Sequence, residues 1–125
     1  MNDRLLKNAF LADGLGSLAS AALLVVGADL LTRPLGLGTD FLTTTGWLLL
    51  PCAALFLWIA RTGSRTLAAT GVLGNLVWVL ASAVAIPILQ PTMLGAVIIA
   101  AQAAAVLAIA ALEYRGLRRA QAVAG

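Results

Sequence analysis

Few side chains of this chain can bind a proton, a cation or a polar ligand, and Asp13 is the foremost of them. It lies inside a run of mostly apolar residues, 10–31. Burial in an apolar medium disfavours an ionised carboxylate, so Asp13 is a candidate for binding a proton or a cation. The structural alternative is a carboxyl that snorkels to the interface or accepts a hydrogen bond from Asn75, Ser17 or a water. The sequence leaves both interpretations open.

Four further side chains complete the predicted ligand- or proton-binding set. Ser17 follows Asp13 by four residues, so the two share a helical face. Asn75 and Trp78 share a face of a later apolar segment, and Gln102 lies in the last one. Because polar faces avoid lipid, we expect the three faces to point at one another. Asn75 and Gln102 are then predicted to meet near mid-membrane.

These polar side chains also have a structural interpretation. Amides such as Asn75 and Gln102 join membrane helices, at about 0.6 kcal/mol per hydrogen bond on average, and this role is favoured over ligand binding. Trp78 either walls a pocket or fills the core, and the sequence favours filling. Glu113 shares a face with Gln102, about 16 Å away along a helix, and is expected at the cytoplasmic edge.

Four mostly apolar segments must position these side chains. They cover residues 10–31, 41–60, 67–89 and 92–112 of 125. A bilayer core of about 30 Å needs about 20 apolar residues per helix, and hydrocarbon requires every backbone polar group to be satisfied within the segment. The sequence therefore predicts an all-α, single-domain integral membrane four-helix bundle. Short connections favour an up-down-up-down order.

The connection between the second and third segments carries helix-end signals. Gly63 is a predicted C-cap and Ser64 a predicted N-cap. Residues 32–40 contain helix breakers, among them Pro34, and are predicted to form a loop. Pro51, inside the second segment, predicts a kink.

Composition excludes several classes of function. The chain is 62% hydrophobic and 10% charged, too little charge to cover a soluble surface. It has no histidine and one cysteine, Cys52, which excludes His-ligated metal sites and an internal thiol pair. Its net charge of +3 comes from residues at segment ends, which favours anionic lipid headgroups over nucleic acid. We expect no cofactor.

Basic residues indicate the orientation. Of the eight Lys and Arg residues, Arg33 alone lies in the connection of residues 32–40. The others fall on the opposite side of a four-helix path: Arg4, Lys7, Arg61, Arg65, Arg115, Arg118 and Arg119. The positive-inside rule then places both termini in the cytoplasm. We expect a multi-pass protein of the bacterial inner membrane.

In size and layout the chain resembles the small multidrug resistance transporters. Those proteins have a glutamate deep in their first helix, within an aromatic-rich stretch. Asp13 takes the corresponding place here, in the sequence Leu11-Ala-Asp-Gly-Leu-Gly16, and the aromatic stretch is absent. The resemblance covers size and layout only and does not establish membership.

Three functions stay open from the sequence. The first is a non-enzymatic bundle that binds a lipid-like small molecule or serves as an accessory subunit. The alternative is a proton-coupled transporter of lipophilic compounds that acts as an oligomer through Asp13. The third, a lipid-modifying enzyme with Asp13 as base and Asn75 or Gln102 as oxyanion donors, is disfavoured because a lone carboxylate is little catalytic equipment. The alanine-rich last segment predicts self-association or a partner subunit.

Overall fold

The chain is helical throughout the part that is described. The computed structural model describes the backbone of residues 2–124 and the side chains of residues 4–120. Within that range the elements are α1 (Asn2–Val26), α2 (Ala28–Leu35), α3 (Thr39–Thr62), α4 (Arg65–Leu89) and α5 (Met93–Ala124). All except α2 are long and apolar enough to cross a membrane. The predicted all-α class is confirmed.

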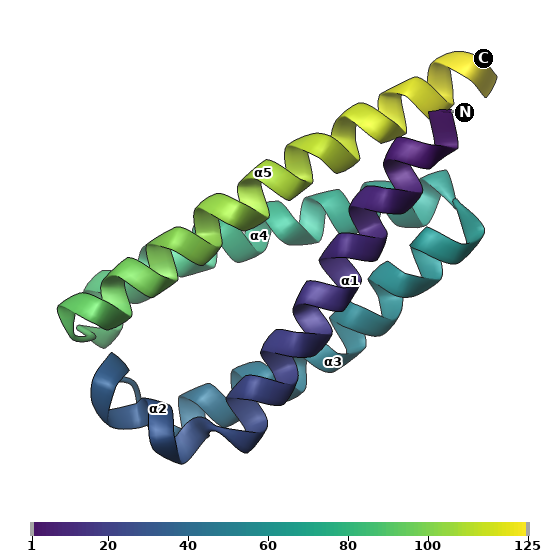
Figure 1. Cartoon of the computed structure of the whole chain (residues 1–125). Coiled ribbons are helices and arrows are strands. Elements are labelled where there is room, and N and C mark those ends of the chain that lie inside the picture. The colour runs from purple at the N-terminus through teal and green to yellow at the C-terminus, as the bar shows by residue number, and fades with distance from the viewer. Residues whose placement is uncertain (1, 125) are drawn as a thin grey trace.

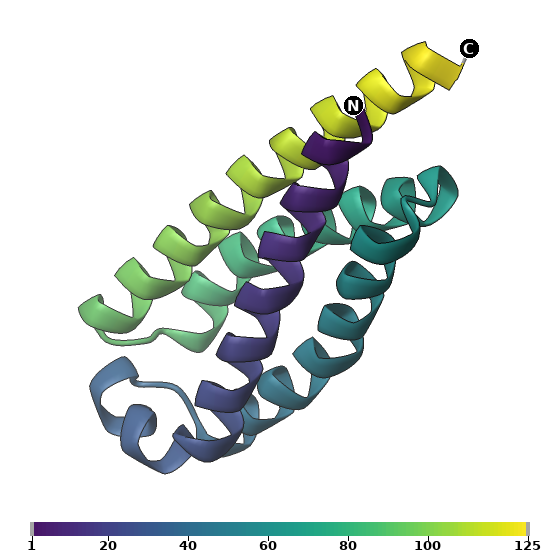
Figure 2. The same cartoon turned by 45° about the vertical axis from the view of Figure 1, so that its right-hand side comes forward.

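The four long helices form two antiparallel pairs. α1 packs along α3, and α4 packs along α5, while α1 also contacts α5. The pairs converge at the end that holds both termini and the α3–α4 turn, and they separate towards α2 (Figures 1 and 2). α3 and α4 touch little beyond their connection. The result is a bundle that is packed at one end and divided at the other.

α2 spans the divided end. The Thr92 hydroxyl donates to the Pro34 carbonyl at 2.6 Å, and the Thr92 backbone N–H donates to the Leu35 carbonyl at 3.1 Å. These bonds fasten the end of α2 to the start of α5. The residues predicted to form a loop, 32–40, are therefore partly helical, with Pro34 inside the last turn of α2.

The first predicted segment differs most from the structure. The sequence predicts one helix over residues 10–31, whereas α1 begins at Asn2 and ends at Val26. The chain bends at Gly27, where a side chain would lie 2.7 Å from the Leu23 carbonyl oxygen. Hydropathy alone misses this break because apolar residues continue on both sides of it.

The second connection follows the prediction. Gly63 has a φ of 66°, and its N–H donates to the Ile59 carbonyl at 2.7 Å, which makes it the C-cap of α3. The Ser64 hydroxyl accepts a hydrogen bond from the Leu67 N–H at 3.3 Å, which makes it the N-cap of α4. Both predicted caps are confirmed.

The last helix continues beyond the predicted end at residue 112. Leu117 is buried in a cluster with Leu6 and Phe10 of α1 and with Phe56 and Ile59 of α3. The polar residues after 112 lower the hydropathy, but Leu117 holds this stretch against α1. The packed end of the bundle therefore includes a part of α5 that the apolar pattern does not reveal.

Candidate functional site: a cavity beside a buried carboxyl cluster

One amide joins three helices at the centre of the bundle. The Asn75 side-chain nitrogen on α4 donates to Oδ2 of Asp13 on α1 at 2.7 Å. The same nitrogen donates to Oε1 of Glu113 on α5 at 2.8 Å. The exposed fractions are 6% for Asp13, 5% for Asn75 and 0% for Glu113. We call these three residues the carboxyl cluster. The Asn75–Asp13 bond is the contact that the structural interpretation of Asp13 expects.

Glu113 is the member of the carboxyl cluster that the sequence reasoning missed. It was expected at the cytoplasmic edge, but the structure gives it no exposed surface. α1 begins earlier and α5 ends later than predicted, so the true helix ends place both Asp13 and Glu113 deeper. The sequence feature that could have identified Glu113 as an inward-facing residue is its spacing: it lies eleven residues after Gln102 and therefore on the same face of the helix.

One oxygen of the carboxyl cluster has no partner. Oε2 of Glu113 is the buried side-chain atom without a hydrogen bond in the part of the chain that the structure describes. The carboxyl groups of Glu113 and Asp13 lie close together, because one oxygen of each accepts a hydrogen bond from the same Asn75 nitrogen. An unpartnered buried oxygen beside a second carboxyl is an arrangement that a proton would complete.

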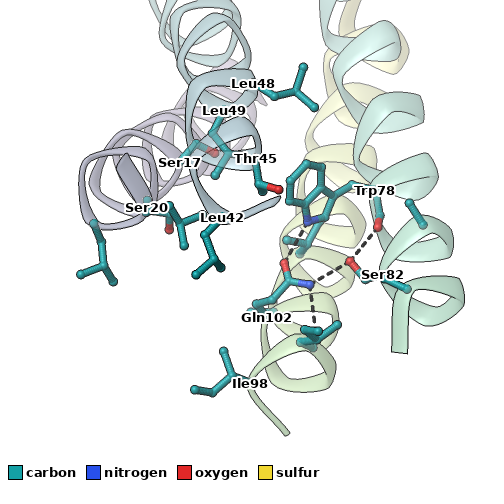
Figure 3. A pocket seen from close by; sticks show the side chains of 18 of the residues that line it. Ser17, Ser20, Leu42, Thr45, Leu48, Leu49, Trp78, Ser82, Ile98 and Gln102 are labelled. Carbon is teal, nitrogen blue, oxygen red and sulfur yellow. Dashed lines mark hydrogen bonds between the residues drawn. The ribbon is translucent and has the colours of Figure 1, made fainter. Parts of the chain in front are cut away.

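A second group of polar side chains lies farther along α4 and α5, and we call it the indole–amide cluster. The Trp78 indole N–H donates to Oε1 of Gln102 at 2.9 Å. The Gln102 amide nitrogen donates to the Ser82 hydroxyl at 2.8 Å and to the Ile99 carbonyl at 2.9 Å. The Ser82 hydroxyl donates to the Trp78 carbonyl at 2.8 Å. Figure 3 shows this closed, uncharged network.

The predicted meeting of Asn75 with Gln102 is wrong. Each amide bonds other side chains: Asn75 bonds the two carboxyls and Gln102 bonds Trp78 and Ser82. Glu113 lies level with Asn75, and Gln102 is eleven residues earlier on α5, about 16 Å away along the helix axis. Because the sequence analysis puts Glu113 at the end of the helix, it also puts Gln102 at the wrong depth along the bundle.

A cavity of about 570 Å³ lies between the two helix pairs. Ser17 of α1 and Thr45 of α3 lie on one wall, facing Trp78, Ser82 and Gln102 on the other (Figure 3). The remaining lining is almost entirely leucine, isoleucine, valine and alanine. Trp78 thus walls a cavity, where the sequence favoured core filling.

Asp13 connects the cavity to the carboxyl cluster. It is the one acidic or basic side chain among the residues that the structure places in the cavity lining. Asn75 and Glu113 lie behind it and do not line the cavity. Four of the predicted site residues therefore line one cavity: Asp13, Ser17, Trp78 and Gln102. The fifth, Asn75, lies behind the cavity wall and donates a hydrogen bond to Asp13.

The cavity is partly open, and a groove continues from it along α4. Phe41, Ala81 and Ala85 line both the cavity and this groove, which Val77 and Ile88 extend. These shared residues come from α3 and α4, so the groove meets the cavity between these two helices. Within the described residues no set of three His, Cys, Asp or Glu side chains is placed to hold a metal ion.

Comparisons of this chain with protein families, with curated proteins and with solved structures found no match. The geometry of the cavity and of the two polar clusters therefore carries the functional argument.

Proposed function

We propose that this chain is an integral membrane protein that binds a lipophilic small molecule in the cavity between its two helix pairs. The observation that carries the proposal is the cavity of about 570 Å³, with apolar walls and a few polar groups. Pockets for small molecules have volumes of about 300–1,000 Å³ and this type of lining. With the four helices of spanning length inserted in a bilayer, the cavity would lie at membrane depth.

The ligand that suits these walls is amphiphilic. The leucine- and alanine-lined part accommodates a hydrocarbon portion, and the Ser17 hydroxyl is available to a polar group. The Thr45 hydroxyl donates to the Phe41 carbonyl at 2.7 Å and can still accept a hydrogen bond from that group. The opening between α3 and α4 faces sideways, so a molecule dissolved in the bilayer can enter without crossing water. Membrane lipids are the nearest source of such molecules.

Catalysis is not part of the proposal. Both side-chain hydrogens of Asn75 are used in bonds to carboxyl oxygens, and those of Gln102 are used on Ser82 and Ile99. Neither amide has a hydrogen left to stabilise an oxyanion. These bonds engage the two amides that the lipid-modifying hypothesis uses as oxyanion donors.

A fluorescence experiment tests ligand binding. The chain has three tryptophans, so Trp47→Phe together with Trp58→Phe leaves Trp78 as the sole indole. The full-length protein in lipid nanodiscs is titrated with a brominated dodecanol, whose bromine quenches a nearby indole. We expect saturable quenching of Trp78. Quenching that rises linearly with probe concentration, as for an indole facing lipid, would contradict binding in the cavity.

Two phenylalanine variants on one helix provide the matched control. Ala81 lines the cavity, whereas Ala83 is exposed and lies outside its lining. Ala81→Phe fills the cavity and should weaken probe binding about tenfold or more, which corresponds to about 1.4 kcal/mol. Ala83→Phe should leave the affinity unchanged. Equal effects of both variants would indicate a general change of the bundle.

The membrane topology of the proposal follows from the charges. With α1, α3, α4 and α5 spanning the bilayer, the positive-inside rule places both termini and the α3–α4 turn in the cytoplasm of a bacterial cell. Single cysteines at Ser64 and Gly38, in a chain with Cys52 replaced, should label from opposite sides of the inner membrane. Labelling of Ser64 from outside intact cells would reverse the orientation.

A second candidate function is proton-coupled transport of lipophilic compounds. Its support is the carboxyl cluster, whose Asp13 lines the cavity. Asp13→Asn keeps size and hydrogen-bonding shape, so it should abolish coupled transport in proteoliposomes at unchanged membrane abundance. Full function of this variant would remove proton coupling and leave the binding role.

Self-association is also proposed, through the alanine-rich face of α5. Ala100, Ala104 and Ala108 are exposed at a spacing of four residues, a pattern that allows close helix approach. Single cysteines at these positions should crosslink two copies, or a copy and a partner subunit, in membranes. Monomer bands at every position would contradict this interface.

A further inference from the structure

We propose that Asp13, Asn75 and Glu113 form a binding site for one proton, shared by two carboxyl groups that a single amide holds in place. This goes beyond the ligand cavity and does not depend on its occupancy. Residue spacing and hydropathy assign no role to Glu113 and point to Asp13 alone as a proton-binding group.

The number of hydrogen-bond donors is the first argument. Asn75 has two side-chain hydrogens and uses one on each carboxyl, at 2.7 Å and 2.8 Å. Oε2 of Glu113 receives no hydrogen bond, although the residue is 0% exposed. A proton bound to one carboxyl supplies the missing hydrogen, because a protonated carboxyl is a donor as well as an acceptor.

Electrostatic repulsion is the second argument. The two carboxyl groups accept hydrogen bonds from the same Asn75 nitrogen and so lie close together, and both residues are buried. Two negative charges in such a site repel strongly, and one proton removes one of them. On uptake, a proton from water forms one O–H bond with a carboxylate oxygen and no other covalent bond changes. The pair then keeps a single negative charge.

The neighbouring helices offer the carboxyl cluster little compensating charge. On these helices, the charged side chains towards the packed end are Arg4 and Lys7 of α1, Arg61 of α3, Arg65 of α4, and Arg115, Arg118 and Arg119 of α5, and the uncharged titratable groups are Cys52 of α3 and Tyr114 of α5. Lys7 lies against Gly63 at the α3–α4 turn, and Arg118 stacks on the ring of Tyr114 at 5.9 Å. Among the described residues, the side chain that donates hydrogen bonds to the two carboxyl groups is Asn75.

Infrared spectroscopy of the full-length protein in lipid nanodiscs tests the proposal directly. A neutral carboxyl has a C=O stretching band that is separate from carboxylate and amide bands. Glu113 is the sole glutamate in the chain, so ¹³C labelling of glutamate marks it without any substitution. We expect a neutral carboxyl band at neutral pH, part of which shifts on ¹³C-glutamate labelling and part on ¹³C-aspartate labelling.

Amide variants provide the second measurement. Asp13→Asn and Glu113→Gln each change the hydrogen-bond partner of the remaining carboxyl, so each should shift the band, and the double variant should abolish it. Asp40→Asn, an exposed aspartate at the start of α3, is the matched control and should leave the band unchanged. The labelling experiment on the unaltered protein stays decisive if a variant fails to fold.

Three results would overturn the proposal. Absence of a neutral carboxyl band at neutral pH would show that no proton is bound. A band that responds to only one of the two labels would assign the proton to one residue and refute sharing. Loss of the band when Na⁺ replaces K⁺ in the buffer would show that the site takes a metal cation. Each result is independent of brominated-alcohol binding, so failure of this proposal and failure of the ligand cavity are distinguishable.

Discussion

Both polar clusters join α4 to α5, and the carboxyl cluster also includes α1, but the two differ in charge and in access to the cavity. In the indole–amide cluster, Trp78, Ser82 and Gln102 satisfy one another, and all three line the cavity. In the carboxyl cluster, one amide donates to two acids, of which Asp13 lines the cavity and Glu113 lies behind it, and one oxygen of Glu113 has no partner among the described residues. The neutral network can be explained as packing. The acidic one requires a proton, which makes it the stronger candidate for function.

Removing the amide from each cluster tests this difference and should give the largest effect. Asn75→Leu takes the donor from two buried carboxyl groups, so we expect a loss of about 3 kcal/mol or more in unfolding free energy. Gln102→Leu should lose about 1 kcal/mol, because the adjacent cavity leaves space for water beside Trp78 and Ser82. Unfolding of the purified protein in micelles by sodium dodecyl sulfate measures both. Equal losses would mean that the two clusters are energetically alike.

Separating α1 from α5 should break the carboxyl cluster alone. A Cβ at Gly116 would lie 2.7 Å from the Leu6 backbone nitrogen, so Gly116→Ala pushes α5 away from α1 and should cost about 1–3 kcal/mol. Gly74→Ala, next to Asn75, meets nothing within 4 Å and should stabilise α4 by about 0.5–1 kcal/mol. The infrared band of the shared proton should change in the first variant and persist in the second. The reverse pattern would refute the role of α1–α5 contact.

Removing one hydrogen bond from the indole–amide cluster should have a smaller effect on stability. Trp78→Phe keeps an aromatic wall but removes the N–H that Gln102 accepts, so we expect a loss of about 1 kcal/mol or less in stability. The proton band should be unchanged, because Trp78 makes no bond to the carboxyl cluster among the described residues. Binding of brominated dodecanol, followed by calorimetry, should weaken several-fold. A changed proton band would show that the clusters are coupled.

The smallest effect is expected at Ser17, which lies between the clusters on the cavity wall. No hydrogen bond is found for its side chain within the described part of the chain, so Ser17→Ala should change stability by less than about 0.5 kcal/mol. Its hydroxyl is available to a ligand, and the affinity for brominated dodecanol should fall about two- to threefold. An unchanged affinity would place the polar end of the probe away from α1.

Sequence by itself determined the helical class, the four apolar segments and much of the candidate site. Length and hydropathy determine these segments because hydrocarbon admits few other backbone structures. The caps Gly63 and Ser64 were predictable because cap chemistry is local. The polar faces followed from helical periodicity, and the Asn75–Asp13 bond is one of the contacts that the structural interpretation of Asp13 left open.

Tertiary structure alone decided where helices end and hence which polar groups share a level. The continuation of α5 depends on Leu117, which packs against Leu6 and Phe10 of α1. This contact has no hydropathy signal. A shift of several residues moves a side chain by about 1.5 Å per residue along a helix, enough to replace the expected Asn75–Gln102 contact with the Asn75–Glu113 bond. The cavity has the same origin, since only the divergence of two packed helix pairs creates it.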